Sequence, residues 1–224
     1  MSEVTIKDVG KIFFVTKEEA ASLPDEERYN YDLLFPYIEK IADELMIATP
    51  DLALTNKMRQ YNPDADYYSE TSAMTFTPKD HPQLKNNLLF LSLEHSENAY
   101  LSGVIAHELR HLWQDRYKPE LRVTRAVGYL DSLYDEAEID ADGYAIAHLS
   151  RMPGMYPDKA GGIICKYEKR HNKKAYAKRI ERAKEIPTEM DAFWEDQRKK
   201  QAEKSAQKIS PASRLWRKIF GGRG

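Results

Sequence analysis

The spacing of apolar and polar residues predicts a chain that begins with strand structure and continues mainly in helices. Residues 4–15 are rich in β-branched and aromatic side chains and predict a strand or hairpin edge. Thr16 followed by Glu19 matches a capping box, which predicts that a short helix opens there. From residue 29 to about residue 48, apolar residues recur at helical spacing and predict a helix that faces the core.

Two further strands and two further helices are predicted in the middle of the chain. Residues 50–66 are polar and contain proline, which predicts a connection rich in loops, and the runs SAMTFTP and NNLLFLSL predict short strands after it. Ser96 can cap the next helix, which Pro119 ends because proline lacks a backbone N–H. A second helix is predicted from about Leu133 to Arg151.

The C-terminal part of the sequence is distinguished by its charge. Residues 160–184 and 188–206 predict two charged helices, and the last residues predict a weakly ordered tail. Residues 166–224 contain 18 Lys and Arg against 8 Asp and Glu, whereas residues 1–165 contain 16 against 28. An acidic body therefore precedes a basic C-terminal region.

Length and composition are those of an ordinary globular protein. With 224 residues, 42% hydrophobic and 31% charged, the chain fits one domain with an appendage, and its net charge of −2 exerts no general pull toward nucleic acid or anionic membrane. Cys165 is the only cysteine, so an intrachain disulfide is excluded. The sequence shows neither a secretory signal nor a transmembrane segment, and we expect a soluble protein of the cytoplasm.

The first predicted central helix carries the most specific chemical pattern, HELRH. His107 and His111 are four residues apart, so on a helix they share one face, with about 5 to 6 Å between their Cβ atoms, and can direct ring nitrogens at one ion. Glu108 is rotated from them by about 100° and can reach a water held by the metal. This is the H-E-x-x-H arrangement, in which the glutamate serves as general base beside zinc.

The next predicted helix offers a third ligand, which a catalytic zinc commonly requires beside an open fourth position. Glu138 and Asp142 in the run EIDAD are also four residues apart, on a face that otherwise carries small and apolar residues. Acids on such a face are costly to bury without a partner, and a cation between the two helices would be that partner. We expect Glu138 to bind zinc and Asp142 to accept the other ring N–H of a ligand histidine.

The two motifs together resemble those of the gluzincin metallopeptidases, in which a later helix carries E-x-x-A-[DN]. The separation of 27 residues between His111 and Glu138 is most similar to that in peptidases of the ImmA/IrrE type, which occur in phages, mobile elements and stress-response systems. The run EIDADGYA matches their E-x-x-A-N-x-F-A, with Asp142 in place of Asn and Tyr144 in place of Phe. Aspartate at this position is equally similar to the gluzincins of the CAAX-protease type. The resemblance covers about residues 73–150.

The resemblance implies a zinc-dependent hydrolase that cleaves peptide bonds of a protein substrate, by analogy a regulatory protein. His107, His111 and Glu138 would hold Zn²⁺, while Glu108 would take a proton from the attacking water and pass it to the leaving nitrogen. Three side chains could supply a further donor for the oxyanion, namely Tyr129, Tyr144 and His148. An extended substrate could add as a strand to the sheet edge.

The expected fold is an α+β fold of the zincin type. A small sheet would pack against the HELRH helix and against the following helix that bears Glu138, with a helical C-terminal extension. Residues 1–155 would form the metallopeptidase domain, with its core at about 73–150. Residues 156–208 would form a basic helical extension and residues 209–224 a weakly ordered tail.

The ligand residues allow other interpretations. His107 and His111 could be hydrogen-bonded helix histidines without a metal. Asp135 or Glu136 could take the place of Glu138 if the helix has a different phase. Glu138 could then be a solvated acid, and Asp142 a surface or capping acid.

The function also has alternatives. A metal-bound zincin module without proteolytic activity could act by binding a partner, although an intact Glu108 argues against a purely structural site. Nucleic-acid binding by the basic region from Lys166 to Arg223 is a further alternative, which the acids that interrupt this region disfavour.

Overall fold

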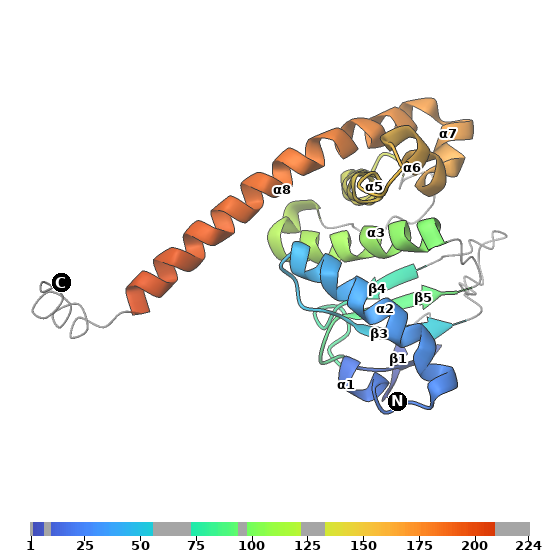
Figure 1. The fold of residues 1–224 in the computed structure, drawn as a ribbon, viewed down its shortest axis with the longest axis vertical. Coiled ribbons are helices and arrows are strands. Elements are labelled where there is room, and N and C mark those ends of the chain that lie inside the picture. The colour runs from blue at the N-terminus through green and yellow to red at the C-terminus, as the bar shows by residue number, and fades with distance from the viewer. Residues whose placement is uncertain (1, 7–9, 56–72, 94–97, 122–132, 209–224) are drawn as a thin grey trace, which may run out of the picture. The chain divides into compact units, whose positions relative to one another are not determined.

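Two small sheets packed against helices make up an α+β architecture, shown in Figure 1. The computed structural model describes residues 2–6, 10–55, 73–93, 98–121 and 133–208. The chain divides into two compact units, Met1–Lys184 and Glu185–Gly224. The α+β class predicted from the sequence is confirmed, and the residues singled out for metal binding all lie in the first unit.

The N-terminal strands form a sheet of their own. β1 (Ser2–Ile6) and β2 (Gly10–Phe14) pair antiparallel, which confirms strand structure in residues 4–15. An isolated antiparallel bridge between Val15 and Leu52 follows β2, and each backbone N–H donates to the partner's carbonyl across 3.0 Å. This bridge ties the first sheet to the second.

The second sheet has three strands in the order β3-β5-β4. β5 (Leu88–Ser92) pairs parallel with β3 (Asp51–Thr55) and antiparallel with β4 (Ala73–Phe76). The predicted strands at β4 and β5 are confirmed. The loop predicted for residues 50–66 is wrong at its start, because β3 is a short strand whose partner β5 is remote in sequence, and local pattern does not reveal such pairing.

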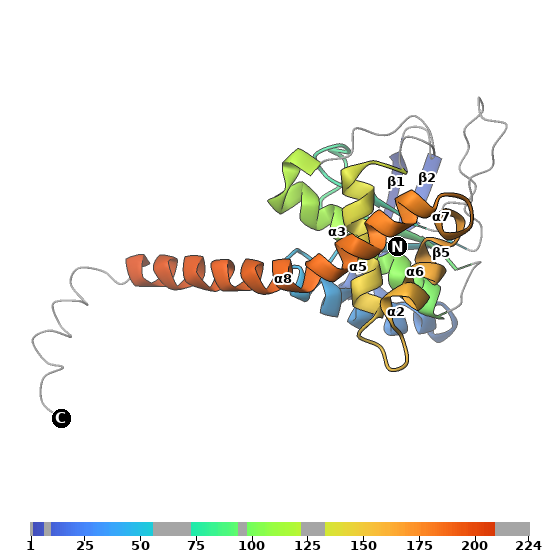
Figure 2. The same ribbon diagram turned by 90° about the horizontal axis from the view of Figure 1, so that it is seen from above.

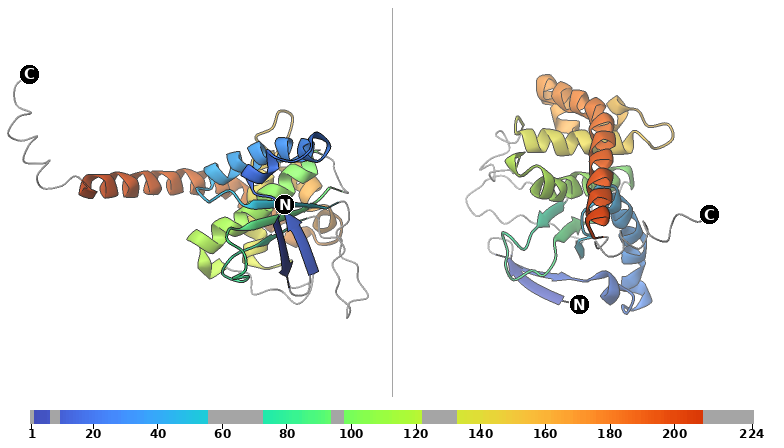
Figure 3. Two further views of the ribbon diagram at one scale, coloured as in Figure 1. Left: turned by 90° about the horizontal axis from the view of Figure 1, so that it is seen from below. Right: turned by 90° about the vertical axis from the view of Figure 1, so that its left-hand side faces the viewer.

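One face of the three-stranded sheet packs on the β1–β2 pair. The buried members of this core are Val4, Ile12, Ala53, Phe76, Leu84 and Leu88. Side chains alternate along a strand, so Thr75, Leu89 and Leu91 belong to the opposite face. Helices lie on that side, and the successive layers are visible in the right panel of Figure 3.

Helices α1 (Lys17–Ala20) and α2 (Asp25–Glu44) connect the two sheets in sequence. The capping box predicted from Thr16 and Glu19 is present, with both reciprocal hydrogen bonds. The helix predicted at residues 29–48 begins and ends earlier than expected. It stops at Glu44, and the chain then turns sharply through Met46, which has a positive φ of 51°.

Helices α3 (Asn98–Tyr117) and α5 (Glu136–Leu149) form the centre of the first unit and confirm the two predicted central helices. They cross one another, as Figures 1 and 2 show. α3 lies on the sheet and under α5, and every residue from Leu101 to Asp115 is buried or half-buried. The 3₁₀ turn η1 (Pro119–Leu121) follows α3, and the predicted cap Ser96 lies outside the described residues.

The C-terminal helices differ from the two that were predicted. α6 (Pro157–Ile164) and α7 (Lys166–His171) precede α8 (Lys173–Lys208), which continues through Pro187. The break expected between residues 184 and 188 is therefore absent, because a proline removes only one N–H and a long helix can accommodate it.

The limits of the predicted domains remain untested. Residues 209–224, for which a tail was predicted, lie outside the described residues, and the predicted boundaries at residues 155 and 208 stay predictions. Among the described residues, no helix combines the length and apolarity needed to cross a membrane.

Candidate metal centre

Three side chains, His107, His111 and Glu138, converge between α3 and α5. Their ligand atoms all lie within 4.8 Å of one another, so that the group could hold a metal ion. The Nε2 atoms of His107 and His111 are 3.0 Å apart. The Glu138 carboxylate oxygens lie 3.5 Å from His107 Nε2 and 3.4 Å from His111 Nε2. α3 presents both histidines on one face, and the crossing helix supplies the acid.

The proton of His107 is placed by Asp142. His107 Nδ1 lies 2.9 Å from Asp142 Oδ1, and because a carboxylate only accepts, Nδ1 carries the hydrogen and donates it. The Nε2 atom of a neutral His107 therefore has a free lone pair directed at the triad. Asp142 therefore accepts a hydrogen bond from one histidine of the triad, the contact that was expected from the sequence.

The proton of His111 is placed by Gln114. The Gln114 amide nitrogen donates to the Ala137 carbonyl across 3.0 Å and to Asp140 Oδ2 across 2.8 Å, which fixes the orientation of the amide. Gln114 Oε1 then faces His111 Nδ1 at 2.9 Å and accepts its hydrogen. The Nε2 atom of a neutral His111 is thus also left with a lone pair.

Two imidazole lone pairs and one carboxylate consequently face each other without a hydrogen between them. A cation, either a metal ion or an added proton, stabilises such a donor set. A tetrahedral ion with bonds of about 2.0 to 2.1 Å spaces its ligand atoms by about 3.3 to 3.4 Å. The distances of 3.0, 3.4 and 3.5 Å between the donors are close to that spacing.

The electrostatics of the site favour positive charge. Burial opposes charge on His107, yet hydrogen bonds with Asp142 and Glu138 hold its pKa well above the ordinary value. Burial likewise opposes charge on Glu138, but the two histidines hold its pKa far below the usual range. For Asp142, too, burial is outweighed by His107 and then by Arg179, and its pKa is lowered. Both acids therefore remain ionised beside the ligand atoms.

Glu108 lies outside the ligand group, as the helical spacing predicted. The Thr75 hydroxyl on β4 donates to Glu108 Oε2 across 3.3 Å. β4 is an edge strand among the described strands, because only β5 pairs with it. Glu108, the residue after His107, is thus hydrogen-bonded to the edge of the sheet.

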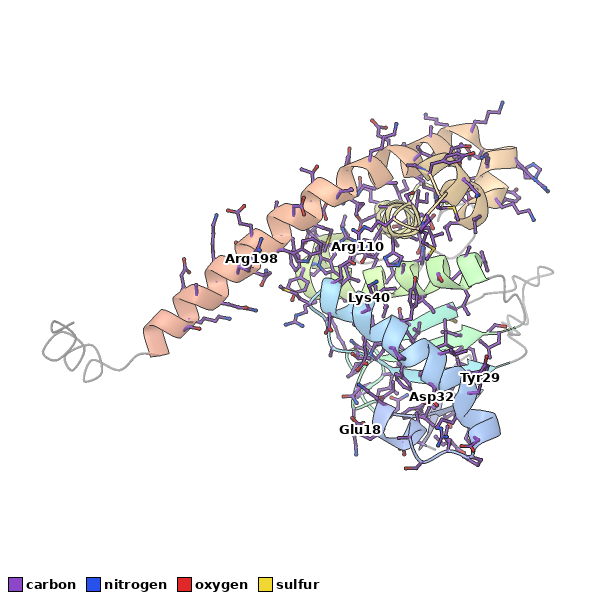
Figure 4. All side chains as sticks on the ribbon, in the orientation of Figure 1. Glu18, Tyr29, Asp32, Lys40, Arg110 and Arg198 are labelled. Carbon is purple, nitrogen blue, oxygen red and sulfur yellow. The ribbon has the colours of Figure 1, made fainter. Side chains whose placement is uncertain are left out.

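A buried ionic network supports the site from the side of α5. Asp140, 2% exposed, accepts hydrogen bonds from Arg110, Arg182 and Gln114 at 2.6 to 3.1 Å. Arg110 is fully buried, with its guanidinium 3.6 Å from the centre of the Trp113 ring, and Figure 4 shows it between α3 and α5. Asp140 was assigned no role from the sequence.

Several predicted alternatives take other partners. Asp135 is the N-cap of α5 and accepts from the N–H groups of Ala137 and Glu138, while Glu136 is exposed. The Tyr144 hydroxyl donates to Glu44, and burial raises the Tyr144 pKa. His148 Nε2 is 2.8 Å from the Tyr37 hydroxyl and lies about 15 Å along the helix from Glu138. Tyr129 lies outside the described residues.

Three residues that hydrogen-bond to the triad or to the acids beside it were not predicted from the sequence: Gln114, Arg179 and Arg182. Gln114 follows His111 by three residues and therefore lies on the same face of α3. Helical spacing alone could have identified it as a neighbour of His111. The two arginines lie in a segment predicted only as a charged helix, and the packing of α8 brings them to Asp142 and Asp140.

Comparisons with protein-family models, with curated proteins and with solved structures find no match for this chain. The functional argument therefore depends on the geometry of the site.

Proposed function

We propose that this protein is a zinc metallopeptidase with a zincin-like fold, of the gluzincin type and most similar to the ImmA/IrrE group. His107, His111 and Glu138 would bind Zn²⁺, Asp142 would orient His107, and Glu108 would serve as general base. The H-E-x-x-H and E-x-x-A-D patterns support this assignment, as does the convergence of their ligand atoms.

One observation carries the proposal. A donor set with both histidine tautomers fixed toward a common point lies beside a carboxylate, Glu108, that is not part of the set. A structural metal site is closed by its ligands and has no use for a neighbouring base, whereas a hydrolytic site needs one. The choice of zinc follows from two imidazoles and one carboxylate at tetrahedral spacing.

The chain's own residues would act in a simple sequence. When bound, zinc supplies a Lewis acid that polarises a carbonyl and makes water acidic. Glu108 would accept the proton of the attacking water and transfer it to the amide nitrogen that leaves. Thr75 would hold the Glu108 carboxylate during this exchange. The outer edge of β4 would align an extended peptide as an added strand.

The substrate class follows from that edge and from the resemblance. An edge strand offers backbone hydrogen bonds to any extended chain, so the substrate would be a protein with an exposed segment, and by the resemblance a regulatory protein. Protein substrates of this kind would be selected by side chains around the site rather than by its metal.

The test is to measure metal content by mass spectrometry and peptide cleavage with a peptide library, for wild type, Glu138→Ala and Glu108→Gln. We expect about one zinc per chain in wild type and in Glu108→Gln, with cleavage only in wild type, and loss of zinc in Glu138→Ala. Zinc binding without cleavage in wild type would favour a non-proteolytic metal-binding module. A folded wild type that takes up no zinc would refute the assignment.

A further inference from the structure

We propose that Arg179 and Arg182 of α8 are positioning residues of the metal centre, each acting on one ligand histidine through an acid of α5. The inference depends on the proposed metal site. It goes beyond that site because it assigns the first part of the C-terminal helix, as far as Lys184, a role in orienting the metal ligands. The two arginines are three residues apart and so lie on one side of α8.

The first connection runs from Arg179 to His107. Arg179 Nε donates to Asp142 Oδ2 across 2.5 Å, while Asp142 Oδ1 accepts from His107 Nδ1 across 2.9 Å. The Arg179 guanidinium also donates to the carbonyls of Leu133 and Ala175, which fixes its own position. Each Asp142 oxygen therefore has a separate partner, and the carboxylate cannot rotate without breaking one of the two bonds.

Asp142 forms an ion pair with Arg179 in a largely buried position. The Asp142 side chain is 14% exposed and the Arg179 side chain 3% exposed. Among the described residues, Arg179 is the one arginine or lysine that forms an ion pair with Asp142. Without the Arg179 guanidinium, Asp142 Oδ2 would lose the hydrogen bond that fixes the carboxylate beside His107.

The second connection runs from Arg182 to His111. Arg182 donates from Nε and Nη2 to Asp140 Oδ1 across 2.8 and 2.6 Å. Asp140 Oδ2 accepts from Gln114, whose Oε1 accepts from His111 Nδ1. Arg110 also pairs with Asp140, so this connection has two cations where the first has one.

Close packing of α8 on α5 explains how both arginines reach the acids. A Cβ atom added at Gly143 would lie 2.6 Å from Arg182 Cγ and 3.3 Å from the backbone nitrogen of Ala183. Only glycine permits this approach, because the nearest atoms belong to the base of a side chain and to the backbone. The contact surface of α5 is therefore shaped for α8 at the turn after Asp142.

Asp140 pairs with two arginines and Asp142 with one, so the two arginine replacements should lower zinc affinity to different extents. Replacing a residue that orients a metal ligand commonly lowers metal affinity about 10- to 100-fold. We expect Arg179→Met to fall in that range, because Asp142 loses the one cation that pairs with it. Arg182→Met should lower zinc affinity less, by roughly two- to fivefold, because Arg110 still holds Asp140.

The experiment measures zinc dissociation constants by competition with a chromophoric chelator, together with visible absorption after loading with Co²⁺. Arg170→Met serves as matched control, since Arg170 is an exposed arginine on α7. Circular dichroism and thermal unfolding of the metal-free variants identify the folded fraction. Should Arg179→Met fail to fold, Arg179→Lys replaces it and is expected to give an intermediate loss of affinity, because lysine keeps the charge and loses the planar group.

The expected result is the order Arg179→Met, Arg182→Met, Arg170→Met in decreasing loss of affinity, with an altered Co²⁺ spectrum for Arg179→Met. A folded Arg179→Met or Arg179→Lys with wild-type affinity and spectrum would overturn the inference and leave the metal site standing. Wild-type protein that binds neither ion would overturn the proposed site and this inference together.

Discussion

The hydroxyl of Thr75 donates to Oε2 of Glu108 across 3.3 Å, so an edge strand of the sheet holds the proposed general base of α3. The strand that would align the substrate and the carboxylate that would activate water are thereby one hydrogen bond apart. In the proposed enzyme, the same four-residue strand would set the position of the peptide and the position of the base.

We expect Thr75→Val to lower the turnover number about 3- to 10-fold and to leave zinc affinity unchanged. Valine keeps the shape of threonine but loses the donor, and one hydrogen bond to a charged group contributes about 1 kcal/mol to a transition state that needs it. Steady-state kinetics on a cleaved peptide and chelator competition measure both quantities. Thr77→Val, which removes a hydroxyl bonded to the exposed Asp80, is the control, and equal losses in both variants would contradict the role given to Thr75.

Asp140→Asn should lower the free energy of unfolding by about 3 to 5 kcal/mol, because it leaves Arg110 and Arg182 facing a neutral amide in the interior. Urea unfolding of the metal-free protein measures the difference. The exposed ion pair between Asp158 and Lys169 provides the control, and Asp158→Asn should have a much smaller effect. Similar losses for the two variants would show that the Asp140 network contributes no more than a surface pair.

A pH dependence is expected from His148. Burial lowers the pKa of His148 to about 4. The negative charge of Glu44 opposes this shift, whereas the positive charges of Arg151 and Lys40 add to it. The unfolded chain, with an ordinary histidine pKa near 6.5, binds the proton more readily, so the contribution of His148 to stability is lost as pH falls from about 6.5 to 4. The loss amounts to at most about 3 kcal/mol.

The measurement for His148 is urea unfolding of zinc-free wild type and His148→Gln between pH 7 and pH 4. Glutamine does not titrate and can keep a hydrogen bond with the Tyr37 hydroxyl. The stability advantage of wild type over the variant should shrink as pH falls, and other titrating groups cancel in the difference. A difference that stays constant across this range would rule out the depressed pKa.

Replacing two helical glycines by alanine should change the stability of the protein in opposite directions. Alanine in place of a helical glycine gains about 1 kcal/mol of helix stability, whereas overpacking costs about 1 to 3 kcal/mol. Gly143→Ala should destabilise the protein and weaken zinc binding, because the new Cβ meets Arg182 and the backbone of Ala183. Gly162→Ala should stabilise it, because the new Cβ meets only the flexible end of Lys169, whose Nζ would be 3.1 Å away. Thermal unfolding and zinc titration measure both, and stabilisation by Gly143→Ala would contradict the close packing of α5 and α8.

The convergence of His107, His111 and Glu138 could be predicted from the sequence because helical spacing is a local property. His107 with His111, and Glu138 with Asp142, each occupy positions i and i+4 of one helix, so their shared faces follow from the period alone. The capping box at Thr16 is local in the same sense. Each of these features could be predicted without knowing which elements pack against the helix.

The parts that sequence reasoning could not reach depend on packing between remote segments. In the sequence, Arg179 is one of many basic residues in a charged segment. Its ion pair with Asp142 becomes apparent only from the packing of α8 on α5. Strand β3 exists through its pairing with β5, 37 positions later in the register between Asp51 and Leu88. Asp140 looks like any surface acid, and its burial follows from two arginines on two other helices.

Helix α3 is covered along most of its length, which limits the substitutions that it can accept. Every residue from Leu101 to Asp115 is buried or half-buried, although the segment includes Glu108, Arg110 and Gln114. We expect most replacements there to be unfavourable, since Glu108, Arg110 and Gln114 each have hydrogen-bond partners and the apolar side chains fill space. Substitution tolerance along this helix should therefore be low for four successive turns, from Leu101 to Asp115, and higher at the exposed Lys118 that follows the helix.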